Sequence, residues 1–170
     1  DYWESVVALN TWQQHRIAQL VVQKLFGTVT GKRLAILGFA FKADTNDTRE
    51  APAIRICGDL LEEGAQLAIH DPKVEPAQMA RDLKQEAAAA ADTLSGTGSW
   101  ALAESVEEAV SGADAVLILT EWNDYRQLNW AELAGRMRKP AWLFDARAVA
   151  DPAVVRAAGL TLWRVGDGEG

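Results

Sequence analysis

Short runs of consecutive apolar residues alternate along the chain with segments in which apolar residues recur every three or four positions. Runs such as Leu34 to Leu37 are typical of strands buried on both faces, and the longer spacing is typical of helices with one buried face. The pattern predicts strands at residues 33–38, 66–69, 115–119, 141–144 and 160–165. It predicts helices at residues 52–63, 76–83, 105–111, 129–137 and 152–158.

Strands and helices that alternate with short connections form parallel sheets with right-handed crossovers. The sequence therefore predicts an α/β fold, a Rossmann-like parallel sheet flanked by helices. The helix that begins at Pro52 places Ile54, Cys57 and Leu61 on one stripe, which we expect to be buried, with Cys57 as a core thiol. Residues 84–99 lack such a pattern, and we expect an insertion loop there, part of it disordered.

A long connecting helix is expected before this fold, because residues 2–26 contain neither Pro nor Gly and carry apolar residues on more than one helical side. A helix of about 24 residues would run roughly 36 Å, too long for one small domain to cover. An ordinary surface helix and a connector to another domain or subunit both account for it. We predict a connecting helix and linker at residues 1–30 and one α/β domain at residues 31–170. The chain begins at Asp1 without an initiator methionine, so we read it as a fragment of something longer.

Composition narrows the possible classes of protein. A chain of 170 residues suffices for one domain and an extra element, and its net charge of −7 argues against nucleic acid or an anionic membrane as partner. The single cysteine excludes an internal disulfide, and with no signal peptide or long apolar run visible we expect a cytoplasmic protein. One cysteine and two histidines predict no metal site.

A polar loop follows the first predicted strand and ends before Pro52, the first residue of a predicted helix. Open α/β sheets bind ligands where a strand ends and such a loop begins. Lys42 and Arg49 add positive charge that suits an anionic ligand. An ordinary loop with solvated charges is the alternative, since the loop contains neither G-x-G-x-x-G nor G-x-x-x-x-G-K-[ST].

The same stretch carries a resemblance to a known family. Residues 38–54, GFAFKADTNDTREAPAI, resemble the GFAFKxDTxDTRESPAI of the C-terminal domain of UDP-glucose 6-dehydrogenases. Three further segments support the resemblance in the right order: IHDPKV at 69–74, LTEW at 119–122 and FDAR at 144–147. Together they cover about residues 1–165. The resemblance implies a UDP-sugar-binding domain, preceded by the end of a central helix that joins the two halves of the enzyme and forms the core of its dimer.

The resemblance also implies which residues bind ligands. Those implied for the UDP-sugar are Phe41, Lys42, Asp44, Thr45, Asn46, Asp47, Thr48 and Arg147. Arg49 is implied to reach NAD bound on the other half of the enzyme, although a local ion pair explains it equally well. Ala43 stands where some members have a second Lys, Asn46 where some have a Gly that permits positive φ, and Ala146 where the family has Gly.

The intact enzyme of this family oxidises the C6 alcohol of UDP-glucose to a carboxylate with two NAD⁺, through a cysteine nucleophile. Cys57 lies in the wrong context for that role, so no catalytic residue is expected in this chain, and the isolated chain is expected to be inactive. NAD would be bound mainly by an N-terminal half that these 170 residues lack. The implied partners are a UDP-sugar, that N-terminal half, and further copies in a homodimer or larger homo-oligomer. A dehydrogenase of GDP-mannose or a UDP-N-acetyl sugar, and a non-catalytic nucleotide-binding or dimerisation module, are the alternatives.

Several residues that follow predicted strands are candidates for one site. Lys42 and Arg147 are 105 positions apart, and in a parallel sheet both would reach the same edge, where they could bind one diphosphate. Asp145 is expected to be structural and to hold Arg147. Asp71 could bind a ribose, but without a glycine fingerprint the Asp-Pro turn is the better interpretation. For residues 120–122, a ligand role and a structural role are equally open.

Overall fold

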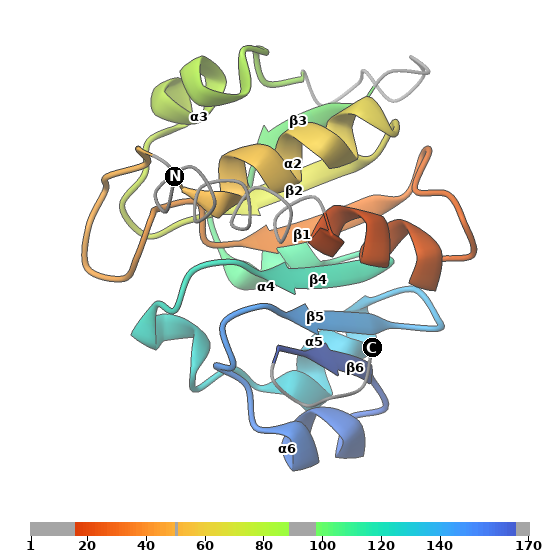
Figure 1. The fold of residues 1–170 in the computed structure, drawn as a ribbon. Helices are drawn as coiled ribbons and strands as arrows, with labels where there is room; N and C mark the ends of the chain where they lie inside the picture. The colour runs from red at the N-terminus through yellow and green to blue at the C-terminus, as the bar shows by residue number, and fades with distance from the viewer. Residues whose placement is uncertain (1–15, 50, 89–97, 166–170) are drawn as a thin grey trace, which may run out of the picture.

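A six-stranded sheet forms the centre of the computed structural model, which describes residues 16–49, 51–88 and 98–165. The strands lie in the order β3-β2-β1-β4-β5-β6, and every neighbouring pair is parallel (Figure 1). Their bounds are β1 Arg33–Leu37, β2 Gln66–His70, β3 Ser99–Leu102, β4 Ala115–Ile118, β5 Trp142–Asp145 and β6 Thr161–Arg164. The predicted Rossmann-like parallel sheet is thereby confirmed.

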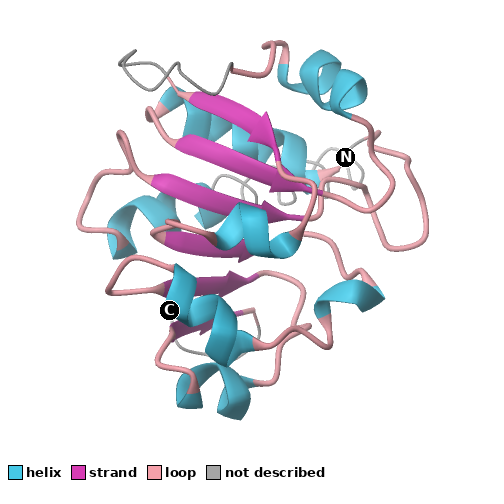
Figure 2. Ribbon diagram, turned by 180° about the vertical axis from the view of Figure 1, so that it is seen from behind, coloured by secondary structure: helices cyan, strands magenta, loops and turns pink. Residues whose placement is uncertain are grey.

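Helices cover both faces of the sheet. They are α2 Pro52–Glu62, α3 Pro76–Leu83, α4 Val106–Val110, α5 Trp130–Arg136 and α6 Pro152–Ala157, with a 3₁₀ turn at Asn123–Tyr125. The helical residues 16–24 and α2 lie on the face turned to the viewer in Figure 1, and α4 and α5 lie on the opposite face, in front in Figure 2. α3 contacts α2, and α6 contacts β6 and α5.

The apolar runs explain why the strands form where they do. Four of the five residues of β1 and all four of β4 are buried, as expected for central strands covered on both faces. In α2 the buried face includes Cys57 and Leu61, as predicted, and also Ile56 and Leu60. Ile54 was expected on that face but is only partly buried, because it lies at the margin of the stripe formed by the buried residues of α2.

The edge strand β3 was not predicted, and the connection expected at residues 84–99 spans residues 84–98, between the end of α3 and the start of β3. β3 has four residues, of which only Trp100 is fully buried, so it shows little hydrophobic run. Ala88 donates a backbone hydrogen bond to Trp100, whose indole N–H donates to the carbonyl of Gln85. Residues 84–88 are therefore held against the sheet, and residues 89–97 lie outside the described part of the chain.

Only part of the predicted connecting helix can be compared with the structure. Residues 16–24 are helical, residues 25–27 form a turn, and residues 1–15 lie outside the described residues. Ala18, Val21 and Leu25 are buried against the rest of the domain. Within the described residues, no helix combines the length and the apolar character needed to cross a membrane.

Candidate functional site

The loops after β1, β4 and β5 leave the sheet at its carboxyl edge, on the left in Figure 1. Strand order reverses between β1 and β4, and this is where open α/β sheets bind ligands. Gly38 ends β1 with a φ of +98°. A Cβ atom at Gly38 would lie 2.4 Å from the Cβ and 2.7 Å from the backbone nitrogen of Thr120. Only glycine therefore allows the backbone after β1 to pass this close to the backbone after β4.

Buried side chains tie these loops together. The Thr120 hydroxyl donates a 2.8 Å hydrogen bond to the carbonyl of Ala40. Asp71, which follows β2, accepts with Oδ2 from the backbone N–H groups of Phe39 and Ala40 and from the indole N–H of Trp122. Its Oδ1 accepts from the N–H groups of two further residues, Lys73 and Val74. Asp71 is therefore a structural residue, in keeping with the turn that the sequence favoured.

The loop expected to contact a nucleotide sugar closes on itself. Phe41 N–H donates to the carbonyl of Asp47, and Asp47 N–H donates to the hydroxyl of Thr45. Phe41, Lys42, Asp44 and Asn46 are exposed, Thr45 and Asp47 are half-buried, and Thr48 is buried. The structure thus leaves most of the predicted contact residues of this loop open to solvent, whereas Thr48 is buried.

The two cations of this loop differ in their surroundings. Arg49 forms a 2.9 Å ion pair with Asp47, and both side chains lie at the surface. The hydrogen bonds from the Arg49 side chain and backbone lower the pKa of Asp47 to about 2. Among the described residues, no side chain forms an ion pair or hydrogen bond with the exposed Lys42. Lys42 is therefore available to an anionic ligand.

Arg147 follows β5 and lies at the same edge. The buried carboxylate of Asp145 accepts hydrogen bonds from the backbone N–H groups of Arg147, Val149 and Ala150, so it fixes the turn that carries the arginine, as predicted. The guanidinium of Arg147 forms an ion pair with Glu121, which follows β4. The sequence indicated the arginine but not this partner.

Glu121 joins the two loops that carry the predicted cations. Its Oε1 accepts a 3.1 Å hydrogen bond from the N–H of Ala43, next to Lys42, and its Oε2 faces Arg147. Burial raises the pKa of Glu121, but the Ala43 N–H, its own backbone N–H and Arg147 outweigh burial and hold that pKa below its usual value. Glu121 is therefore ionised at neutral pH. The threonine–glutamate–tryptophan run after a strand was the sequence signal for it.

Backbone conformation explains two departures from the family pattern. The left-handed residue of the first loop is Asp44, with a φ of +67°, whereas Asn46 does not have positive φ. In the turn after β5 the left-handed residue is Ala148, with a φ of +55°, and not Ala146. Neither replacement of a family glycine therefore falls on a left-handed position.

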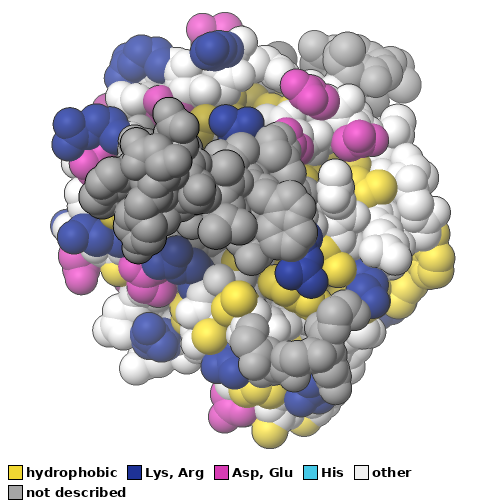
Figure 3. Space-filling model, viewed as in Figure 1, with side chains coloured by type: hydrophobic (Ala, Val, Ile, Leu, Met, Phe, Trp, Pro, Cys, Tyr) yellow, Lys and Arg dark blue, Asp and Glu magenta, His cyan; other side chains and the backbone are white. Residues whose placement is uncertain are grey.

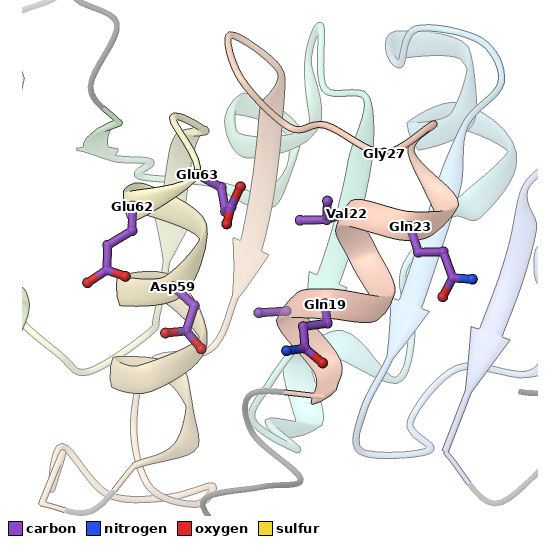
Figure 4. A pocket seen from close by; sticks show the side chains of 8 residues that line it. Gln19, Val22, Gln23, Gly27, Asp59, Glu62 and Glu63 are labelled. Carbon is purple, nitrogen blue, oxygen red and sulfur yellow. The ribbon is translucent and has the colours of Figure 1, made fainter.

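Basic and acidic side chains lie next to one another along the carboxyl edge, on the left of the face shown in Figure 3. A separate pocket lies between the helical residues 16–24 and α2 (Figure 4). The side chains around it include Gln19, Val22, Gln23, Asp59, Glu62 and Glu63. None of the described residues that line it is basic, so this pocket suits an anionic ligand less well than the carboxyl edge does.

Two groups outside the edge loops also bear on function. Cys57 is completely buried in α2, and burial raises the pKa of its thiol, which makes it unreactive. His70 lies at the end of β2 with its Nδ1 atom 2.9 Å from the hydroxyl of Tyr125. No three His, Cys, Asp or Glu side chains come together as a metal-binding group within residues 16–49, 51–88 and 98–165.

Known proteins resemble this chain in sequence and in fold. Residues 35–152 match the model of the UDP-glucose/GDP-mannose dehydrogenase family, UDP binding domain. The chain is 40% identical over 167 residues to a UDP-glucose 6-dehydrogenase of Caenorhabditis elegans, which covers 98% of this chain and 34% of that protein. It is 43% identical over 150 residues to a UDP-glucose 6-dehydrogenase of Rattus norvegicus, which covers 88% of this chain and 30% of that protein. The chain thus spans about a third of the length of these curated relatives.

Solved structures share the fold at lower identity. A UDP-glucose dehydrogenase from the archaeon Pyrobaculum islandicum superposes with a TM-score of 0.68 at 23% identity, covering 95% of this chain and 31% of that one. A UDP-D-ManNAc dehydrogenase from Pyrococcus horikoshii superposes with a TM-score of 0.67 at 22% identity, covering 94% of this chain and 31% of that one.

The family model matches more than half of the chain. The loop after β1, which carries the sequence motif of the family, lies at the carboxyl edge of the sheet. The chain belongs to the UDP-glucose/GDP-mannose dehydrogenase family and contains its UDP binding domain.

Proposed function

We propose that this chain binds the UDP part of UDP-glucose at the carboxyl edge of its sheet, as the C-terminal domain of a UDP-glucose 6-dehydrogenase. The observation that carries the proposal is the link through Glu121, which holds the Arg147 turn and the Lys42 loop at one place. Lys42 and Arg147 would bind the diphosphate through charge-assisted hydrogen bonds. Phe41, Asp44, Thr45, Asn46, Asp47 and Thr48 would shape the surrounding site for the sugar and nucleoside.

The intact enzyme would oxidise the C6 alcohol of UDP-glucose to UDP-glucuronate, and this domain would supply substrate binding and orientation. The 170 residues contain no G-x-G-x-x-G motif, so NAD would be held mainly outside them. Arg49 would be the contribution of this domain to NAD binding, after giving up part of its ion pair with Asp47. Nothing in this scheme needs a metal, and the cytoplasm is where we expect the reaction.

A dehydrogenase of another nucleotide sugar is the second candidate, because some structural relatives are dehydrogenases of UDP-N-acetyl sugars or of GDP-mannose. Those relatives share 19–22% of their residues with this chain, whereas the curated UDP-glucose 6-dehydrogenases share about 40%. The higher identity extends over 98% of the chain, which favours UDP-glucose.

We also propose that residues 1–30 are the end of a connecting helix and a linker, and that the protein self-associates through this helix. Residues 31–170 would form the ligand-binding domain.

Calorimetric titration of the chain with UDP tests the binding site. A charge-assisted hydrogen bond contributes about 1.5–3 kcal/mol, so Lys42→Ala or Arg147→Ala should weaken UDP binding roughly ten- to a hundredfold. Uridine, which lacks phosphates, should bind the variants and the parent alike. Arg156→Ala is the matched control, because Arg156 is an exposed cation in the last turn of α6.

Thermal melts of the same variants separate a binding effect from unfolding. Parent-like melts with weakened UDP binding support the site. Parent-like UDP binding by both variants would show that the site is wrong. Loss of fold in both would make Lys42 and Arg147 structural residues.

A further inference from the structure

Glu121 occupies an unusual place for an acid, between two loops proposed to bind an anion. It is part-buried, with 26% of its side chain exposed, and its two carboxylate oxygens serve different loops. Oε1 accepts from the Ala43 N–H in the loop after β1, and Oε2 pairs with Arg147 in the turn after β5. An acid that merely faced the ligand would repel a diphosphate, so its two contacts need an explanation.

The contact with Arg147 leaves most of the guanidinium unused. Glu121 pairs with Nη2, and no residue in the described part of the chain hydrogen-bonds to Nε or Nη1 of Arg147. The backbone of Arg147 is fixed by Asp145, and among the described residues Glu121 is the ion-pair partner of its guanidinium. A guanidinium held at one nitrogen keeps its remaining N–H groups in a rigid, planar arrangement that matches phosphate oxygens.

The contact with Ala43 acts on the loop of Lys42. The hydrogen bond to the Ala43 N–H fixes the residue between Lys42 and the left-handed Asp44. Glu121 therefore contacts both loops that carry the proposed diphosphate-binding cations.

We infer that Glu121 is a positioning residue for the diphosphate, which orders Arg147 and the Lys42 loop in the ligand-free protein. This inference rests on the proposed function of the same site. Side chains that are ordered before binding lose less conformational freedom on binding, and affinity rises accordingly. The opposite possibility is that Glu121 competes with the ligand for Arg147, in which case removing the acid would tighten binding.

Variants of Glu121 distinguish positioning from competition when titrated with UDP. Glu121→Ala removes both contacts and should weaken UDP binding about tenfold, as the loss of one charge-assisted hydrogen bond does. Glu121→Gln keeps one oxygen acceptor, which can serve only one of the two partners, and should recover part of that loss. In the Arg147→Ala background, Glu121→Ala should have a much smaller effect, because the arginine that it positions is gone. A structural role alone would predict neither the recovery nor this loss of effect.

Glu132→Ala is the matched control, since Glu132 forms an exposed ion pair with Arg136 on α5, away from the edge. It should bind UDP like the parent. Should Glu121→Ala fail to fold in a thermal melt, Glu121→Asp replaces it, because the shorter side chain cannot reach both partners. We expect the Asp variant to bind UDP more weakly than the Gln variant.

The outcomes separate this inference from the proposed function. If Arg147→Ala weakens UDP binding but Glu121→Ala (or Glu121→Asp, where that replaces it) leaves it unchanged or tightens it, the proposed site stands and the positioning role is wrong. Equal effects of Glu121→Ala with and without Arg147 also overturn positioning. If the parent chain does not bind UDP, both the proposed function and this inference fail.

Discussion

Asp71 accepts a 3.0 Å hydrogen bond from the indole N–H of Trp122, 51 positions further along the chain. The same carboxylate oxygen accepts from the backbone of Phe39 and Ala40. One buried acid therefore connects the loops after β1, β2 and β4. These are the loops that frame the proposed ligand site, so the position of the site depends on a residue that need not touch the ligand.

Replacing Asp71 by Asn should destabilise the domain. An amide has one oxygen acceptor, so at least two buried N–H donors would face an NH₂ group, at a cost of about 3 kcal/mol. Urea denaturation of the variant and the parent measures the change in the free energy of unfolding. Asp124→Asn is the control, because Asp124 is exposed. A variant as stable as the parent would show that these hydrogen bonds contribute little.

Gly38→Ala should also destabilise the domain, through backbone strain and crowding at Thr120. Left-handed backbone and overpacking together should cost about 2–5 kcal/mol. Gly135→Ala in α5 is a matched control, because no described atom lies within 4 Å of the added Cβ and helical Ala is favoured over Gly. The control should be neutral or stabilising in the same denaturation experiment. Equal stabilities of the two variants would contradict the close approach of β1 to Thr120.

The free energy of unfolding should fall as pH falls below about 6.5, and protonation of His70 should contribute to this fall. Burial lowers the pKa of His70 from its ordinary value of 6.5, although Asp71, Asp124 and Glu107 oppose that effect. The unfolded chain then binds a proton more readily than the folded chain, so stability is lost as pH decreases from 6.5 toward the folded pKa.

Urea denaturation between about pH 7.5 and pH 5.5 tests this, and His70→Gln should show a smaller loss than the parent. His15→Gln is the control, since His15 is the only other histidine in the sequence. Identical pH dependence in His70→Gln and the parent would rule out a contribution from His70.

The isolated chain should not reduce NAD⁺ in the presence of UDP-glucose. Its only cysteine is buried in α2 with a raised pKa, so it cannot act as a nucleophile. The absorbance of NADH, followed with a purified chain, measures the activity, and an intact UDP-glucose 6-dehydrogenase provides the positive control. Steady turnover that persists in Cys57→Ala would contradict the assignment of this chain as a binding domain alone.

Self-association should depend on the N-terminal segment. If residues 1–26 form a connector between subunits, the full chain should form dimers or larger oligomers, and a chain without those residues should be monomeric. Analytical ultracentrifugation over a range of concentrations measures this, with a circular dichroism spectrum to confirm that the shortened chain still folds. A monomeric full chain at high concentration would contradict the connector.

The sequence by itself determined the family, the helices α2 to α6 and every strand except β3. Apolar runs such as Leu34 to Leu37 predicted the central strands, because a strand buried on both faces has no polar positions. Their alternation with helices predicted a parallel sheet, because a helix between two successive strands connects them in the same direction. The stretch from Gly38 to Ile54 and the arginine at 147 were enough to indicate the family and the edge of the sheet at which we propose that the ligand binds.

Only the tertiary structure decided how the residues at that edge are paired. The partners of Asp71 and Glu121 lie up to 78 positions away, and side-chain type alone does not show which donor reaches which acceptor. The short edge strand β3 was missed for a similar reason, since its pairing with β2 rather than its own pattern makes it a strand. Local periodicity reports burial along one element, whereas long-range hydrogen bonds depend on the position of every element.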